Sequence, residues 1–159
     1  ALTVKSILAV KARDLRDDDL EPLARAAMRH GETVSGADYL AAVSRIHLYT
    51  RHMAPFFQDY DVLLTPTLAE LPARIGRFDH NRDDFLDYRM GDDGIFAYSP
   101  FTAAFNATGQ PAMSVPLAWV DGLPVGMHFA AGFGRDLQLI SLAADLERAA
   151  PWFNRVPPL

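Results

Sequence analysis

The chain has 159 residues, of which 50% are hydrophobic and 22% are charged, and its formal net charge is -5. This composition is that of an ordinary globular protein, so a disordered or collagen-like chain is excluded, and the length suits one domain with its own core. Lys5 and Lys11 are the only lysines. Because the acidic chain has no basic stripe to neutralise phosphates, we expect no nucleic-acid partner.

The residue types that bind metals or span membranes are also missing or badly spaced. The chain has no cysteine, which excludes disulfides and thiolate metal sites. No apolar run approaches the roughly 20 residues that cross a bilayer. His47 and His52 are five residues apart, so they do not share a helix face as ligands four apart would. We therefore expect a cytoplasmic protein with no membrane segment, no metal and no cofactor.

Two helices are predicted near the beginning of the chain. The acidic cluster Asp17-Asp18-Asp19 precedes Leu20-Glu21-Pro22, and acidic residues with proline in the first turn indicate a helix start. We expect this helix over residues 19–29, ended by Gly31. Ser35 with Asp38 three residues later resembles a capping box and predicts a second, longer helix.

Three strands and two more helices are predicted further along the chain. Residues 61–65 form a short apolar run ended by Pro66, the pattern of a strand buried inside a sheet. Residues 111–117 and 124–131 are strand candidates, and Asp121-Gly122 between them is a type I′ hairpin signal. A short helix over 100–108 precedes this hairpin and a last helix over 135–149 follows it. Three strands are few for an independent sheet covered by helices, which is consistent with part of the sheet lying elsewhere.

Residues 67–99 lose regular periodicity and are rich in proline, glycine and mixed charge, so we expect a long loop there. Aromatic residues are depleted in disordered segments, so the aromatic residues of this loop argue against pure disorder. They are Phe78, Phe85, Tyr88, Phe96 and Tyr98.

Ser114 is the strongest candidate for a nucleophile within the chain, because His128 lies across the predicted hairpin from it and Asp121 lies at the turn. No Gly-x-Ser-x-Gly elbow surrounds Ser114, so we interpret Ser114 and His128 as side chains of one sheet. Thr65-Pro66-Thr67 is better placed for ligand binding, because ligands of α/β sheets gather beyond strand ends. A strand stop with a hydroxyl cap is the competing interpretation of those three residues.

The run Phe105-Asn-Ala-Thr-Gly-Gln-Pro-Ala-Met-Ser-Val-Pro116, followed by Asp121-Gly-Leu-Pro-Val-Gly126, resembles the C-terminal signature of the amidase signature family. Asp61-Val-Leu-Leu-Thr-Pro-Thr67 is similar to the strand and proline turn that precede that signature. The segment from Gly134-Arg-Asp-Leu137 onward is similar to the final helix. The resemblance covers most of residues 60–152, with a weaker helical match over 17–57.

The resemblance implies an α/β fold with a mixed sheet flanked by helices on both faces. In that fold the chain corresponds to the C-terminal third of an amidase, as a single partial domain over residues 1–159. The family hydrolyses amide C-N bonds with two serines, the second of them beside a cis peptide bond, and a lysine. The serines lie in a Gly-Gly-Ser-Ser-Gly-Gly run, and the lysine lies upstream of that run. This chain has no Ser-Ser pair and no such run. The resemblance therefore assigns no catalytic residue to it.

The resemblance also implies roles for individual residues. Asn106 and Thr108 would fix the helix-to-strand turn through their polar side chains, with Gly109 supplying the turn, Pro111 starting the strand and Gly126 shaping the hairpin return. The segment 67–101 would line or cover the substrate pocket, and its aromatic residues imply an apolar acyl or aryl group on the substrate. The candidate pocket residues are Thr65, Pro66, Thr67, Phe96, Phe101 and Phe105.

Three functional hypotheses follow. The first is the C-terminal part of an amide hydrolase, whose partners are a small-molecule amide and the missing N-terminal portion; an incomplete sheet would also favour a homo-oligomer. The second is a non-catalytic binding or structural module with the same architecture. The third is a small serine hydrolase that uses Ser114 and His128, and it requires Ser114→Ala to abolish activity in this chain alone.

Overall fold

The computed structural model describes residues 1–16 and 18–157, so Asp17 of the predicted acidic cluster lies outside the described residues. Contacts between Cα atoms divide the chain into two compact units. Unit 1 comprises Ala1–Ala42 and Arg74–Ala97, and unit 2 comprises Val43–Ala73 and Tyr98–Leu159. The single partial domain over residues 1–159 stays a prediction.

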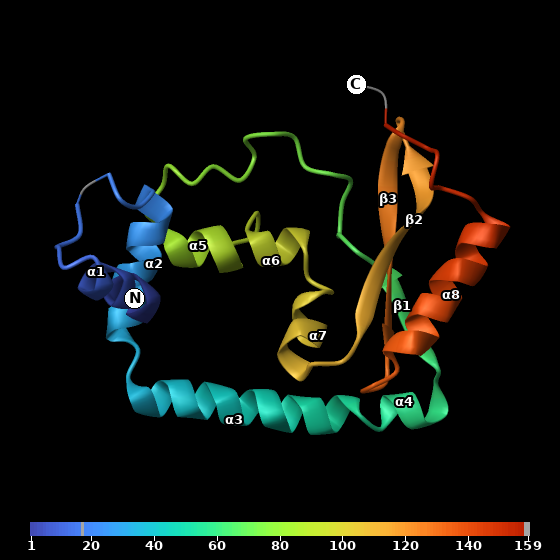
Figure 1. Cartoon of the computed structure of the whole chain (residues 1–159), viewed down its shortest axis with the longest axis horizontal. Coiled ribbons are helices and arrows are strands. Elements are labelled where there is room, and N and C mark those ends of the chain that lie inside the picture. Colours follow the sequence, from blue (N-terminus) through green and yellow to red (C-terminus); the bar gives the residue numbers. More distant parts are fainter. Residues whose placement is uncertain (17, 158–159) are drawn as a thin grey trace. The chain divides into compact units, whose positions relative to one another are not determined.

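Unit 1 is helical, and α2 and α5 pack against each other within it. Leu23 and Ala26 of α2 are buried, as is Tyr88 of α5. His80 links the two helices, because its Nδ1 lies 2.8 Å from Glu21 Oε2 and its Nε2 lies 3.0 Å from the Tyr88 hydroxyl. The helices that contribute to unit 1 are α1 Leu2–Val10, α2 Pro22–Thr33, the first part of α3 Gly36–Met53, α5 Phe85–Met90 and most of α6 Ile95–Tyr98 (Figure 1).

The predicted helix over 19–29 begins later and ends later than expected, and the prediction that Gly31 ends it is wrong. The helix α2 runs through Gly31 to Thr33. A Cβ placed on Gly31 would lie 3.4 Å from the Ala1 Cβ. The absence of a side chain at Gly31 therefore leaves room for the first residue of the chain beside α2. Asp19 precedes the helix and pairs instead with Arg13 at 2.6 Å, a hydrogen bond that lowers the pKa of the Asp19 carboxyl.

The capping box at the start of α3 is confirmed. The Asp38 backbone N–H donates to Ser35 Oγ at 3.1 Å, and the Ser35 backbone N–H donates to Asp38 Oδ2 at the same distance. The Ser35 hydroxyl also donates to Asp38 Oδ2 at 2.6 Å. Two backbone donors that a helix start leaves without partners are thereby satisfied, which explains why α3 begins at Gly36.

The predicted loop over 67–99 contains two short helices, α5 and α6, and α1 was not predicted either. Short helices depend on tertiary contacts more than on local sequence signals. In α5 that contact is made by Tyr88, which is 7% exposed. At the start of α5, Arg82 forms ion pairs with Asp84 and Asp87.

Unit 2 contains a three-stranded antiparallel sheet in the order β1-β3-β2. The strands are β1 Val62–Pro66, β2 Ala112–Val120 and β3 Leu123–Ala131, all close to the predicted ranges. The prediction that the first strand lies inside the sheet is wrong for the described residues, because β1 is at an edge. β3 is the only one of these strands with a neighbour on each side, and accordingly its last four residues are all buried.

The hairpin between β2 and β3 is confirmed as a type I′ turn. Asp121 and Gly122 have φ values of 50° and 78°, and both central residues of this turn type need a positive φ. The pairing from the turn runs regularly to Ala118 and then shifts by one residue before Pro116. This shift in register is a β-bulge in the hairpin. Proline has no N–H to donate to the hydrogen-bond ladder of a sheet, so Pro116 is tolerated at such an irregularity.

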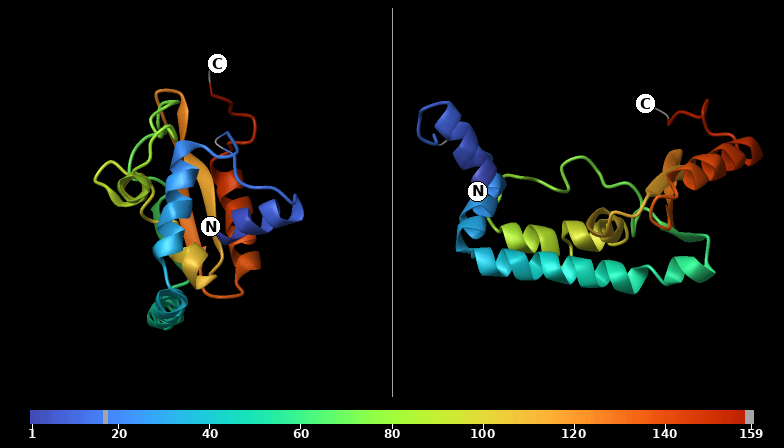
Figure 2. Two further views of the ribbon diagram at one scale, coloured as in Figure 1. Left: turned by 90° about the vertical axis from the view of Figure 1, so that its left-hand side faces the viewer. Right: turned by 60° about the horizontal axis from the view of Figure 1, so that its bottom comes forward.

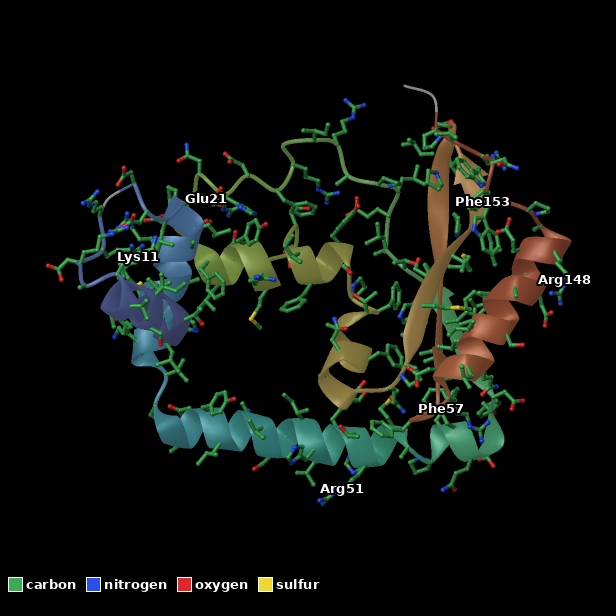
Figure 3. All side chains as sticks on the ribbon, in the orientation of Figure 1. Lys11, Glu21, Arg51, Phe57, Arg148 and Phe153 are labelled. Atoms are coloured by element: carbon green, nitrogen blue, oxygen red, sulfur yellow. The ribbon has the colours of Figure 1, made fainter. Side chains whose placement is uncertain are left out.

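Helices cover both faces of this sheet, which confirms the predicted α/β architecture. On one face α8 Asp136–Ala149 packs through Leu139 against Val115, Phe129 and Ala131 (Figures 1 and 2). On the other, Phe57 of α4 Phe56–Asp59 and Phe105 of α7 Ala103–Thr108 enclose Ala130. Figure 3 labels Phe57 where α4 meets the sheet.

The capping box gives a stability prediction. Ser35→Ala removes the side-chain acceptor at the start of α3, so we expect the free energy of unfolding to fall by about 1 kcal/mol. Ser44→Ala is the matched control, because Ser44 lies in the middle of the same helix and is exposed, and alanine favours helix there. Urea unfolding followed by circular dichroism measures both. Equal stability of the two variants would contradict the role of Ser35.

Candidate functional site

Three polar side chains lie in register across the unit 2 sheet. His128 at the centre of the sheet pairs with Thr65 on β1 and with Ser114 on β2. Directly paired residues of antiparallel strands point to the same face. This is the face covered by α4 and α7, since the neighbouring residues Val115 and Phe129 pack against α8 on the opposite face. Polar groups therefore gather on one face only.

A hydroxyl pair spans the central strand on this face. Thr67 Oγ1, in the residue directly after β1, lies 2.6 Å from Ser114 Oγ of β2, so the two side chains meet across β3. Gly126 lies beneath this pair: a Cβ placed on it would lie 2.6 Å from both hydroxyl oxygens. The Thr67 backbone N–H also donates to the Gly126 carbonyl at 2.9 Å. Gly126 is thus required because any side chain there would separate the two hydroxyls.

His128 is a buried histidine with a defined partner. It is 4% exposed, and its Nδ1 lies 3.2 Å from Thr65 Oγ1. The Phe105 ring covers the imidazole, with the two ring centroids 5.2 Å apart. Burial lowers the pKa of His128 below its usual value, because desolvation disfavours the imidazolium form. The imidazole is therefore neutral at pH 7.

The turn from α7 into β2 brings a second set of polar groups to this face. Gly109 ends α7 with φ 74°, the left-handed conformation that favours glycine, and its N–H donates to the Phe105 carbonyl at 2.9 Å. Thr108 donates its hydroxyl to Gln110 Oε1 at 3.0 Å, and both side chains are buried. The Pro111 carbonyl accepts from the Ala131 N–H at 3.0 Å and leads directly into β2.

A cavity of about 320 Å³ lies between α7 and the polar face of the sheet. It contains Thr67 and Phe105 from the predicted pocket residues, together with Asn106 from the predicted turn residues. No Asp, Glu, Lys or Arg belongs to its lining. The lining residues are Thr67, Thr102, Phe105, Asn106, Gln110, Ala112, Met113, Ser114 and His128.

The other predicted pocket residues lie elsewhere. Thr65 is bonded to His128 beneath the cavity lining, and Pro66 is exposed at the end of β1. Phe101 is half-buried in the turn before α7. Phe96 belongs to unit 1 and is 45% exposed. The structure thus brings Thr67 and Phe105 together and leaves the other four predicted pocket residues outside the lining of this cavity.

The pocket residues Thr102, Gln110 and Ser114 were not predicted as such from the sequence. A signal for the first was present, because residues 102, 105 and 106 are spaced three and four apart and such residues share one helix face. Successive residues of a strand point to opposite faces of the sheet, so Ser114 faces the other way from Met113 and Val115. To place Ser114 on the same face as His128, the pairing of the two strands across the hairpin had to be known. Gln110 carried no such signal.

Unit 1 has a cavity of its own, of about 270 Å³. Its polar wall is the Glu21–His80–Tyr88 chain of hydrogen bonds, and Phe85 of the predicted aromatic loop also lines it. Tyr88 is only 7% exposed. These hydrogen bonds from Glu21 through His80 to Tyr88 therefore hold α2 and α5 together. Within residues 1–16 and 18–157, no cluster of three or more His, Asp or Glu side chains could hold a metal ion. Nor does any described helix have the length and apolar character of a membrane span.

The comparisons with known proteins agree on one family. The sequence model described as Amidase matches residues 4–140. A Mycobacterium leprae protein named "Putative amidase AmiC" is 46% identical over 112 residues, which cover 70% of this chain and 23% of that protein. The 6-aminohexanoate-cyclic-dimer hydrolase of Paenarthrobacter ureafaciens is 31% identical over 151 residues, covering 92% of this chain and 31% of that one.

Solved structures give the same result. A structure of 6-aminohexanoate cyclic dimer hydrolase matches with a TM-score of 0.83 and 28% identity, over 97% of this chain and 33% of that one. A bacterial aryl acylamidase of the amidase signature family matches with a TM-score of 0.75 and 28% identity, over 95% and 32% of the two chains. The chain belongs to the amidase signature family, and it spans about a quarter to a third of the length of these relatives.

The hydroxyl pair over β3 gives a test of Gly126. In Gly126→Ala the new Cβ must displace Ser114 and Thr67, so we expect a loss of about 1 to 3 kcal/mol of unfolding free energy. Gly36→Ala is the control, because a Cβ there meets nothing within 4 Å. Denaturant unfolding compares the two variants. Combining Gly126→Ala with Ser114→Ala should recover part of the loss, and strict additivity would contradict the contact.

The buried imidazole gives a pH prediction. Because the folded pKa of His128 is lowered, the unfolded state binds a proton first as pH falls. The stability due to neutral His128 is therefore complete above the unfolded value of about 6.5 and is lost as pH falls through and below it. We expect unfolding free energy to decline less between pH 7.5 and 5.5 in His128→Gln than in the parent. A His128 NMR titration midpoint above 6.5 would refute this.

Proposed function

We propose that this chain is the C-terminal part of an amide hydrolase that cleaves carboxylic amide C-N bonds, and that it contributes scaffold and substrate pocket but no nucleophile. The main support for this proposal is the polar cavity of unit 2, which lies on one face of the sheet. The chain that forms this cavity spans 31% to 33% of the length of two amidase relatives. Such cavities with a few convergent polar groups are the usual form of a small-molecule site.

The hydrogen bonds of this face support a non-catalytic role. A serine nucleophile needs a base within hydrogen-bond reach. Here Ser114 bonds to Thr67, and His128 bonds through Nδ1 to Thr65. Neither pairing activates Ser114, which argues against the small serine hydrolase that the sequence left open.

The sheet supports the same proposal. β1 and β2 each have one paired side among the described strands. An edge strand presents free backbone N–H and C=O groups, which pair readily with another strand. We assign these edges to the N-terminal portion of the parent hydrolase, and pairing of two copies of this chain is the outcome expected when that portion is absent. The small-molecule amide substrate and the cytoplasmic location are part of the same proposal.

The proposal is tested by reacting the purified 159-residue chain with an activated fluorophosphonate and assaying hydrolysis of aliphatic and aromatic amides. We expect no mass increase and no turnover, because no activated serine is present. Stoichiometric labelling that Ser114→Ala abolishes would overturn the proposal in favour of a small serine hydrolase.

The second half of the test uses the native reading frame upstream of Ala1. We expect that frame to encode a Gly-Gly-Ser-Ser run, and the extended protein to be labelled and to hydrolyse amides. An upstream start codon with no such run would favour the alternative, a binding or structural module without chemistry.

A further inference from the structure

Three side chains of unit 1 are arranged as an activated nucleophile requires. Glu21 Oε2 lies 2.8 Å from His80 Nδ1, and His80 Nε2 lies 3.0 Å from the Tyr88 hydroxyl. A weak nucleophile needs a base within hydrogen-bond reach, and that base needs a third group to orient it. In this Glu21–His80–Tyr88 series the phenol, the imidazole and the carboxylate stand in these three relations.

The carboxylate determines which ring nitrogen of His80 accepts a hydrogen. A carboxylate only accepts hydrogen bonds, so Nδ1 of His80 carries the hydrogen of the bond to Glu21. In the neutral imidazole the other nitrogen, Nε2, is then an acceptor, and the Tyr88 hydroxyl donates to it. His80 can therefore take the phenol hydrogen directly.

The backbone of His80 and the ring of Tyr88 hold the base in this position. The His80 carbonyl accepts from the Leu23 N–H at 3.1 Å, in the first turn of α2. The His80 and Tyr88 rings also meet edge to face, with their centroids 5.6 Å apart. The base and the nucleophile are thus in place before any ligand binds.

The unit 1 cavity provides a place for a reactant beside the phenol. Tyr88 is 7% exposed, but Tyr88 and His80 both line this cavity of about 270 Å³, so a molecule seated there contacts both. An apolar lining of this kind suits an aryl or short alkyl group. The apolar lining residues are Leu23, Ala24, Ala27, Phe85 and Ile95.

We propose that Tyr88 is an acyl-acceptor site, at which the phenol takes an acyl group from an aryl ester bound in the unit 1 cavity. The phenol oxygen attacks the ester carbonyl carbon while His80 Nε2 takes the phenol hydrogen. The bond from that carbon to the aryloxide then breaks, and His80 gives the hydrogen to the departing aryloxide. The products are one acylated Tyr88 and one free phenol. Glu21 is a positioning residue, because it acts through His80.

The test treats the full 159-residue chain with p-nitrophenyl acetate and follows acetylation of each tyrosine by peptide mass spectrometry. Tyr39 and Tyr60 are internal references, since they are 65% and 59% exposed and would react first if exposure alone set the rate. General-base assistance contributes about 10²- to 10⁴-fold, so we expect Tyr88 to be acetylated at least about tenfold faster than either reference despite its burial. Equal or slower acetylation of Tyr88 would overturn the proposal.

A histidine variant tests the base. His80→Gln removes the group that takes the phenol hydrogen, so we expect acetylation of Tyr88 to slow at least about tenfold. His30→Gln is the matched control, because His30 packs on Phe85 of the same cavity, with the ring centroids 5.8 Å apart. We expect this control to leave the acetylation rate of Tyr88 unchanged. An equal loss of rate in both variants would assign the effect to packing and overturn the proposal.

A carboxylate variant tests the positioning role and stays informative if His80→Gln disturbs the fold. The Glu21 side chain is 65% exposed, so Glu21→Gln should leave unit 1 folded, which circular dichroism checks. We expect acetylation of Tyr88 to slow about three- to tenfold. We also expect imidazole nitrogen NMR to show less of the Nδ1–H tautomer of His80 than in the parent. Unchanged acetylation and an unchanged tautomer would overturn the assignment of Glu21.

The acyl-acceptor site concerns unit 1 and does not rest on the proposed function. It adds one acyl group to Tyr88 and involves no turnover of amides. A phosphonate adduct on Tyr88 would persist in Ser114→Ala, whereas labelling of Ser114 would be lost. Failure of the acyl-acceptor site can therefore be told apart from failure of the proposed hydrolase.

Discussion

The register of β2 on β3 determines which side chains meet on the polar face of the sheet. The type I′ turn at Asp121-Gly122 sets Val120 opposite Leu123, and continuing that pairing without interruption would place Val115 opposite His128. The bulge between Pro116 and Ala118 shifts the register by one residue, so Ser114 is opposite His128 instead. A shift of one residue exchanges the two faces of a strand. The hydroxyl pair and the cavity both depend on this bulge.

The same alternation separates packing from polar chemistry within unit 2. Along β3, Phe129 and Ala131 pack toward α8, while His128 and Ala130 point to the face covered by α7. Gly126 continues the second series and has no side chain, and the space above it is taken by the Thr67 and Ser114 hydroxyls. One face therefore supplies the hydrophobic contacts that stabilise the sheet, and the other can carry buried polar groups because each has a partner.

Local signals in the sequence predicted the parts of this structure that depend on local physics. The Ser35–Asp38 capping box and the Asp121-Gly122 turn each need only a few neighbouring residues, and both were predicted from the sequence. The errors concern distant contacts. Gly31 lies within its helix and next to Ala1, and α5 packs against α2, where the rings of Phe85 and His30 are in contact. The cavity was predicted only in part, since its lining depends on a bulge that Pro116 allows but does not dictate.

The edge strand β1 explains how a serine and a histidine can be neighbours in a sheet without forming a catalytic pair. Ser114 and His128 are directly opposite each other in the pairing of β2 with β3, so their side chains lie close together on one face. β1 and the residue after it each supply a threonine: Thr65 of β1 bonds His128, and Thr67, which directly follows β1, bonds Ser114. Among the described residues no hydrogen bond joins Ser114 Oγ to either ring nitrogen of His128, so a proton transfer from Ser114 to this imidazole has no prepared path. Ser114 and His128 are therefore paired in the strand register and yet bonded to different partners.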